Sequence, residues 1–154
     1  MKIYIASDHA GFQVKEKIKL FLVKKKIDFA DMGTDSLKSV DYPDYAIRVA
    51  ERVASGRNSR GILICGTGTG MTVAANKVNG IRAVAAYDAY SAKMSRIDND
   101  TNILGLRGRF FPIKKILAIV AIWLKTPFSG NTRHKQRLKK ISAYEKRPSH
   151  ELGT

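Results

Sequence analysis

Short apolar runs and segments of helical periodicity alternate along the chain. Five apolar runs predict buried strands: residues 3–6, 27–30, 62–65, 82–85 and 102–106. Apolar side chains recur at helical spacing over 12–22 and over 46–53, where Pro43 suits a first helical turn and Gly56 a helix end. Strands that alternate with helices in this way are typical of βαβ units around a parallel sheet, so the pattern predicts an α/β fold.

The longest apolar run, Ile116–Leu124, lies between two lysines and predicts a buried helix, because a membrane-spanning helix takes about 20 residues. The 154 residues fit one domain, to which we assign residues 1–144, with residues 145–154 as a flexible C-terminal tail. The first residues already read as a strand, without the pattern of a cleaved leader. The single cysteine excludes an internal disulfide and a multi-cysteine zinc site, so a cytoplasmic protein is expected.

Positive charge is in excess, since 28 Lys and Arg residues stand against 13 Asp and Glu, a net charge of +15. Three explanations are open: nucleic-acid binding, a small anionic substrate, and a solvated cationic surface, which accounts best for the bulk of the charge. Proteins that bind single-stranded RNA interleave basic residues with aromatic ones, and the basic stretch 133–140 contains no aromatic residue. We therefore expect no specific nucleic-acid partner.

Polar residues follow three of the predicted strands directly. They form the segments Ser7–Gly11, Cys65–Gly70 and Tyr87–Asp88. In an open parallel sheet, ligands bind beyond the carboxyl ends of the strands. The sequence therefore predicts a site where these three segments meet.

The segment after the third run is rich in glycine, at positions 66, 68 and 70. Glycines let backbone N–H groups converge at the start of a helix, where an anion or oxyanion is stabilised. Met71 stands where a dinucleotide fingerprint needs its last glycine, and the Gly-Lys-Ser/Thr ending of a P-loop is missing. The glycines alone leave an anion site and a generic tight turn equally open.

Three further features carry possible chemistry, each with a plainer alternative. Cys65, at the end of a strand, is either a small buried apolar residue or a thiolate that accepts a proton. His9, next to Asp8, suits proton transfer near neutral pH, although a lone histidine is often a surface group. Arg133 and Arg137, with His134 between them, share one helix face, which suits a phosphate or a solvated basic helix.

Together these segments resemble the type B ribose-5-phosphate isomerases and the related galactose-6-phosphate isomerase subunits. The resemblance covers about residues 1–145 through motifs in one order: Ser7–Gly11, Asp41–Pro43, Ile64–Gly70, Ala74–Lys77, Ser95–Arg96 and Asn99–Asn102. It implies a Rossmann-like three-layer sandwich with a five-stranded parallel sheet and a C-terminal helix. It also implies a homodimer or a dimer of dimers with shared active sites, and no metal or nucleotide cofactor.

The resemblance also implies a role for each candidate residue. Cys65 is the catalytic base, Thr67 assists it by hydrogen bonding, and His9 is a further catalytic group. The backbone N–H groups of Gly66, Thr67, Gly68, Thr69 and Gly70 bind the oxyanion. Asp8, Tyr42 and Asn99 contact sugar hydroxyls. The phosphate is surrounded by basic residues, some from a partner subunit: His9, Arg109, Arg133, His134 and Arg137.

One position departs from the family pattern, because Asp98 stands where many relatives have a histidine that assists opening of the furanose ring. Another group such as His9 then opens the ring, or the substrate differs, or activity is low. The expected function is interconversion of ribose 5-phosphate and ribulose 5-phosphate through a cis-enediol(ate), a step of the pentose phosphate pathway. The alternatives are an isomerase for a six-carbon sugar phosphate of the galactose 6-phosphate or allose 6-phosphate type, and a non-catalytic polyanion-binding module.

Overall fold

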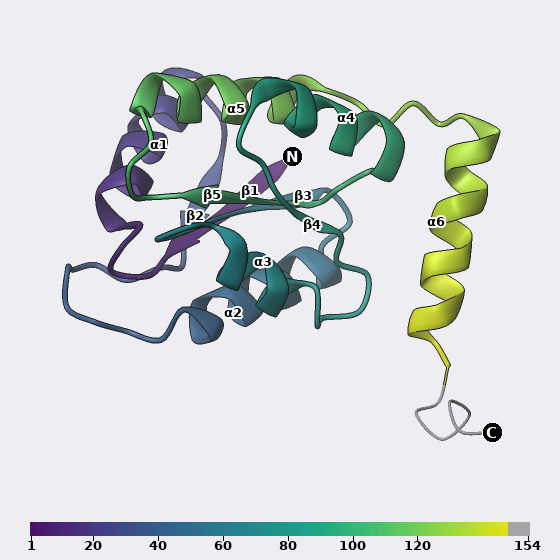
Figure 1. Ribbon diagram of the computed structural model, residues 1–154, viewed down its shortest axis with the longest axis horizontal. Helices are drawn as coiled ribbons and strands as arrows, with labels where there is room; N and C mark the ends of the chain where they lie inside the picture. The colour runs from purple at the N-terminus through teal and green to yellow at the C-terminus, as the bar shows by residue number, and fades with distance from the viewer. Residues whose placement is uncertain (148–154) are drawn as a thin grey trace.

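One parallel sheet of five strands organises the molecule, in the spatial order β2–β1–β3–β5–β4 (Figure 1). The computed structural model describes residues 1–147. The strands are β1 (Lys2–Ser7), β2 (Phe29–Asp31), β3 (Ser59–Cys65), β4 (Ala83–Ala85) and β5 (Ile103–Arg107). All four pairings are parallel, as apolar runs without strict alternation indicate. The predicted α/β fold is confirmed.

Helices cover both faces of the sheet and make it the middle of three layers (Figure 1). The six helices are α1 (Phe12–Lys24), α2 (Tyr42–Ser55), α3 (Thr69–Ala75), α4 (Ala89–Asn99), α5 (Ile113–Lys125) and α6 (Thr132–Glu145). In Figure 1, α1, α4 and α5 lie above the sheet, while α2 and α3 lie below it. The sixth helix stands apart at the right, next to α4.

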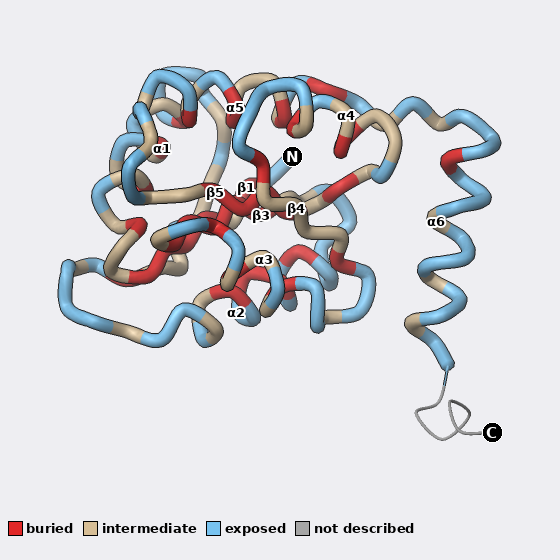
Figure 2. Tube along the Cα trace, in the orientation of Figure 1, coloured by how far each residue is buried: buried red, intermediate tan, exposed pale blue. Residues whose placement is uncertain are grey.

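Side chains of the central strands point alternately into two apolar clusters, one on each face of the sheet. Along β3, Ile62 and Ile64 pack in the cluster beneath α1 and α5, whereas Leu63 and Cys65 pack in the cluster against α2 and α3. Figure 2 shows the buried residues concentrated along these strands and on the inner sides of the helices. This alternation sends the thiol of Cys65 toward the α2–α3 face.

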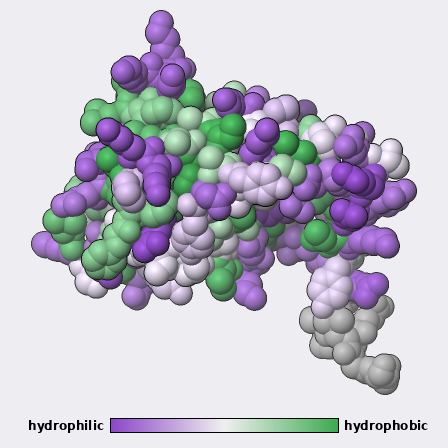
Figure 3. Space-filling view, turned by 45° about the horizontal axis from the view of Figure 1, so that its top comes forward, coloured by the Kyte–Doolittle hydropathy of each residue, from purple (hydrophilic) through white to green (hydrophobic). Residues whose placement is uncertain are grey.

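Helix α5 confirms the prediction of a buried helix in the segment 116–124. It buries Ile116, Ile119, Val120 and Trp123, which share one face at the spacing of an amphipathic helix. No helix among residues 1–147 is long and apolar enough to cross a membrane. Figure 3 shows hydrophobic side chains gathered at the upper left, on the side of α1 and α5, with hydrophilic ones over most of the right half.

The last described helix, α6, is mostly exposed. His134 is its one buried residue, whereas Ile141 and Tyr144 are exposed apolar side chains. Glu145 is still helical, and its carboxylate accepts a hydrogen bond from the N–H of Gly80 at 3.3 Å. Of the predicted tail, residues 148–154 lie outside the described part of the chain.

Candidate active site

Loops that follow β1, β3 and β5 meet at the carboxyl edge of the sheet. The N–H of Asp8 donates to the carbonyl of Ile64 at 3.2 Å, which joins the first loop to β3. The N–H of Gly108 donates to the carbonyl of Cys65 at 2.7 Å, and the N–H of Arg109 to that of Gly66 at 3.2 Å. These backbone bonds place three sequence-distant loops around the end of β3, as predicted for a parallel sheet.

Cys65 is the last residue of β3 and is only 4% exposed. Its sulfur accepts a hydrogen bond from the N–H of Gly68 at 3.2 Å, so the glycine loop folds back over the thiol. A backbone donor that faces the sulfur can hydrogen-bond to negative charge that develops there. The arrangement therefore suits a cysteine that accepts and returns a proton.

The glycine loop keeps its shape through close backbone contacts. Gly68 adopts φ +84°, and a Cβ built on it would lie 2.8 Å from the carbonyl carbon of Leu106, so only glycine fits there. The hydroxyls of Thr67 and Thr69 lie 2.6 Å apart and share a hydrogen bond. The hydrogen bond to the Cys65 sulfur thus comes from the backbone of Gly68, while the Thr67 hydroxyl is hydrogen-bonded to Thr69.

Tyr42 and Arg109 lie against the two ends of the glycine loop. A Cβ on Gly70 would lie 2.9 Å from the Tyr42 ring, and one on Gly66 would lie 3.7 Å from an Arg109 Nη. Arg109 therefore places a positive charge beside the N–H groups of the loop, and Tyr42 places a phenol at its far end. An anionic group that reaches this loop meets both backbone donors and a guanidinium.

Asp8 and His9 lie at the same edge and have defined partners. One Asp8 oxygen, Oδ1, accepts from the N–H groups of Ala10 and Gly11 at 2.9 and 3.0 Å, which fixes the turn into α1. His9 Nδ1 accepts from the N–H of Val40 at 3.3 Å. Because Nδ1 is the acceptor, the neutral ring carries its proton on Nε2, where it is available for donation.

The remaining predicted residues lie elsewhere in the same chain. Helix α4 begins after β4, at the carboxyl edge, and its 11 residues carry Asn99 to the opposite edge, about 16 Å along the helix axis. His134 lies near this end of α4, because its Nε2 is 3.5 Å from an Asp98 oxygen and its Nδ1 is 2.8 Å from the Ser129 hydroxyl. Arg133 donates from Nε to His134 Nε2 at 3.1 Å.

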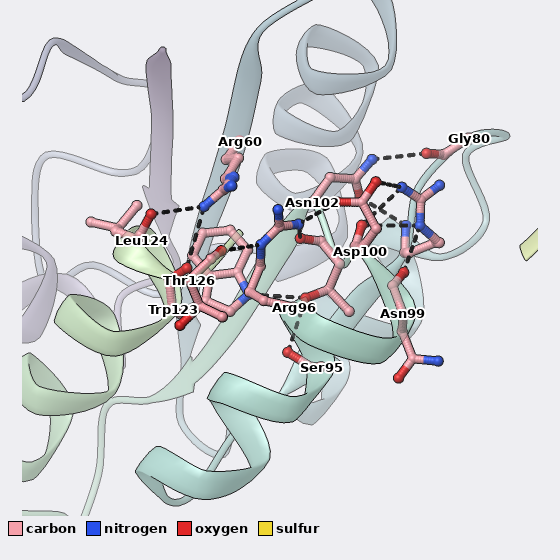
Figure 4. Close-up of polar contacts among 12 residues, drawn as sticks. Arg60, Gly80, Ser95, Arg96, Asn99, Asp100, Asn102, Trp123, Leu124 and Thr126 are labelled. Carbon is pink, nitrogen blue, oxygen red and sulfur yellow. Dashed lines mark hydrogen bonds and ion pairs between the residues drawn. The ribbon is translucent and has the colours of Figure 1, made fainter. Parts of the chain in front are cut away.

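A network of arginines holds the end of α4 in place (Figure 4). Arg82 donates to the carbonyl of Asn99 at 2.9 Å and to the carboxylate of Asp100, and Arg96 donates to the same carboxylate. Burial, together with the charge of Arg96, lowers the pKa of the neighbouring Arg60 to about 10. Figure 4 shows the side chain of Asn99 pointing away from this network.

The predicted residues therefore form two groups in one chain. The first group lies at the carboxyl edge: Asp8, His9, Tyr42, Cys65, Gly66, Thr67, Gly68, Thr69, Gly70 and Arg109. The second group, Asn99, Arg133, His134 and Arg137, lies on α4 and α6. Among residues 1–147, no cluster of three or more His, Cys, Asp or Glu side chains is placed to hold a metal ion.

The sequence argument placed Tyr87 after a strand without giving it a role. Its hydroxyl donates to the carbonyl of Thr67 at 3.2 Å, so Tyr87 belongs to the glycine loop's surroundings. The neighbouring Asp88 caps α4, because its carboxylate accepts the N–H of Ser91 at 2.7 Å. In the sequence, the only feature that pointed to a role for Tyr87 was its position directly after a predicted strand.

Comparison with known proteins places this site in a family. The family model described as ribose/galactose isomerase matches residues 3–141. Ribose-5-phosphate isomerase B of Escherichia coli is 45% identical over 146 residues, which cover 95% of this chain and 97% of that protein.

Solved structures agree over nearly the whole chain. A ribose-5-phosphate isomerase B of Clostridium thermocellum has a TM-score of 0.92 at 50% identity and covers 95% of this chain and 98% of its own. The Mycoplasma genitalium enzyme, solved with bound ribulose 5-phosphate, has a TM-score of 0.91 at 39% identity. The match covers 96% of this chain and 97% of the Mycoplasma chain. The fold, the order of the motifs and these matches agree, and the chain belongs to the ribose/galactose isomerase family.

Proposed function

We propose that this protein is an aldose–ketose isomerase that interconverts ribose 5-phosphate and ribulose 5-phosphate. The observation that carries the proposal is the buried thiol of Cys65, which ends β3 beneath a loop of backbone donors and near Arg109. The ribulose 5-phosphate bound by the Mycoplasma relative supports the choice of substrate.

The proposed chemistry moves one proton between neighbouring carbons. The Cys65 thiolate takes the proton from C2 of the open-chain aldose and leaves a cis-enediolate. Backbone N–H groups of residues 66–70 stabilise the oxyanion on O1, an effect that contributes on the order of 3 kcal/mol. The thiol then returns its proton to C1, and the proton on O2 moves to O1, so C1 becomes a CH2OH group and C2 becomes the ketone carbonyl. Thr67 orders the loop through its bond to Thr69.

His9 is the proposed acid for opening the furanose ring. Its Nδ1 accepts from Val40, so the proton of the neutral ring sits on Nε2. Asp8 and Tyr42 lie at the same edge and are the proposed contacts for sugar hydroxyls. Asp98 stands at the family's histidine position, and a carboxylate only accepts hydrogen bonds.

A partner subunit supplies the second group of residues in this proposal. Asn99, Arg133, His134 and Arg137 lie away from Cys65 within one chain, and α6 exposes Ile141 and Tyr144. A homodimer, or a dimer of dimers, that places α6 and the end of α4 against the neighbouring carboxyl edge completes each site. The phosphate then lies among Arg109, His9 and the partner's basic side chains. The cytoplasm is the proposed location, since a single unpaired cysteine suits a reducing compartment.

An isomerisation assay on a panel of five- and six-carbon aldose phosphates tests the proposal. We expect the highest kcat/KM with ribose 5-phosphate, and incorporation of solvent deuterium at C1 only to the extent that the Cys65 thiol exchanges its proton with solvent before returning it. A higher kcat/KM with a six-carbon sugar phosphate would show that the substrate is of the galactose 6-phosphate or allose 6-phosphate type. No turnover of any sugar, with polyanion binding that weakens steeply with salt, would favour the binding module instead.

A further inference from the structure

Tyr87 and Cys65 are joined through a single peptide group. The hydroxyl of Tyr87 donates to the carbonyl of Thr67 at 3.2 Å, and the N–H of Gly68 donates to the sulfur of Cys65 at 3.2 Å. That carbonyl and that N–H belong to the same planar amide, and they point in opposite directions from it because the peptide is trans. The phenol and the thiol therefore bind opposite ends of one dipole.

We propose that Tyr87 is a positioning residue that strengthens the hydrogen bond from Gly68 to Cys65 by polarising the peptide between them. A bond donated to a carbonyl shifts electron density toward its oxygen and makes the N–H of that amide a better donor. The bond also fixes the plane of the peptide, so its N–H stays aimed at the sulfur. Both effects favour the thiolate, which is the form that accepts a proton.

The local structure suits this role. Gly68, with φ +84°, lies against the backbone of Leu106, so the glycine loop has little freedom on its inner side. On the outer side, the Thr67 carbonyl meets Tyr87, which follows β4 and precedes the capping residue of α4. Tyr87 is 42% exposed, so its ring is not a core element whose loss would disrupt the fold.

Other charged or titratable groups surround the loop and are left in place when the hydroxyl is removed. On the neighbouring loops and α2 they are Asp8, His9, Tyr42 and Arg109. Beside Tyr87, Asp88 and Lys115 line the same shallow cavity of about 210 Å³. A change of Tyr87 to phenylalanine keeps the ring and all these groups, so its effect reports on one hydroxyl.

The proposal rests on Cys65 acting as the base, but its main test needs no substrate. We expect Tyr87→Phe to slow alkylation of Cys65 by iodoacetamide at neutral pH about two- to five-fold and to move the midpoint of the pH–rate profile upward. The amide proton of Gly68 should shift upfield in the NMR spectrum, since its hydrogen bond weakens. Replacing Tyr87 with 3-fluorotyrosine, a stronger donor, should shift both readouts the opposite way.

Tyr90→Phe is the matched control, because Tyr90 lies three residues further along the chain, is 75% exposed, and its hydroxyl makes no hydrogen bond among the described residues. If Tyr87→Phe and Tyr90→Phe leave the same alkylation profile and the same Gly68 amide shift as the parent, the proposal is overturned. In turnover, the effect is measured on an Asp98→His background, where proton abstraction from C2 is expected to become the slow step: Tyr87→Phe should lower kcat there about two- to five-fold with little change in KM. Altered alkylation with unchanged kcat on that background would keep the hydrogen-bonded link through the peptide and remove Cys65 as the base.

Discussion

Cys65 combines burial, a strand end and a backbone donor at its sulfur. The sequence alone could not separate a packing cysteine from a reactive one, since both types stand at strand ends. The structure adds the hydrogen bond from Gly68, which a thiol with a purely packing role does not require. It also places Arg109 and His9 within the same set of loops.

Cys65→Ala should lower kcat at least about 10²-fold, because it removes the group that takes the proton from C2. Steady-state assay of ribose 5-phosphate isomerisation measures this effect. Iodoacetamide should inactivate the parent by modifying its only thiol, and ribose 5-phosphate should protect it. Near-normal turnover by Cys65→Ala would show that Cys65 is a packing residue and not the catalytic base.

Asp98 is the residue at which the chain leaves its family pattern. Its carboxylate lies 3.5 Å from His134 Nε2 and is about a third exposed. An ionised aspartate cannot protonate the ring oxygen, so we expect ring opening to limit turnover of the furanose forms.

Asp98→His should therefore raise kcat on ribose 5-phosphate, most clearly at saturating substrate. A deuterium effect at C2 should be small in the parent and larger in this variant, since proton abstraction then becomes the slow step. Asp98→Asn is the control, because it removes the charge near His134 without adding an acid. An unchanged or lower kcat in Asp98→His would mean that another group opens the ring, and His9 would be the next residue to test.

At the scale of elements, the strands were predicted best, because each buried strand is a short apolar run. The run 27–30 shows how an end can be misplaced. The N–H of Ile27 donates to the carbonyl of Leu22, so Ile27 closes the last turn of α1, and β2 begins only at Phe29.

Helix α4 was not delimited from the sequence, because its buried face carries Ser95 and Arg96 as well as Ala92. A buried arginine breaks the apolar pattern by which helices are recognised. Arg96 is tolerated there because it donates to the carbonyls of Thr101 and Thr126 and to Asp100. Such partners lie far apart in the sequence and become visible only in three dimensions.

An ion pair between a buried lysine of α1 and a partly exposed aspartate of the edge strand β2 joins these two elements. Lys15 is 1% exposed, and its ammonium lies 2.5 Å from Asp31 and 3.3 Å from Glu16. Burial alone would raise the pKa of Asp31, but hydrogen bonds from Lys15 and Lys19 outweigh it and hold that pKa below its ordinary value.

Asp31→Asn should lower the free energy of unfolding by about 2 kcal/mol at neutral pH, because it removes the carboxylate nearest to the buried ammonium of Lys15. In the parent, the lowered pKa means that this stabilisation is complete above about pH 4 and is lost as pH falls through the folded value. Urea unfolding between pH 2 and 7 measures both. Asp28→Asn is the control, since its pair with Lys2 is exposed and spans 4.0 Å. Equal losses in the two variants would contradict a special role for the buried pair.

At the scale of the molecule, the resemblance implied active sites shared between subunits, but the sequence did not say which candidate residues lie together in one chain. Motif order says nothing about distance, and only the course of α4 across the sheet separates Asn99 from Cys65. In the proposed dimer, the basic side chains of α6 would bind the phosphate of the substrate, which would account for part of the net charge. The rest of the +15 fits a solvated cationic surface.

Two impaired variants distinguish a site shared between subunits from a site within one chain. Arg137→Ala should raise KM about ten- to hundred-fold, since a lost charge-assisted hydrogen bond costs roughly 1.5–3 kcal/mol. When Cys65→Ala and Arg137→Ala chains are co-expressed, a mixed dimer combines an intact Cys65 on one chain with an intact Arg137 on the other. That pairing restores one of its two sites and removes both groups from the second site.

Random pairing makes half of the dimers mixed, so at low substrate the co-expressed sample should recover about a quarter of the parent kcat/KM. Samples of the two variants mixed without subunit exchange provide the baseline, which is the average of two impaired enzymes. Recovery requires that Cys65 and Arg137 meet across an interface, because no mixed dimer carries both groups intact on one chain. If co-expression gives only the baseline, Cys65 and Arg137 of the same chain form the site. A rearrangement within the protomer would then have to bring α6 to the carboxyl edge of its own sheet.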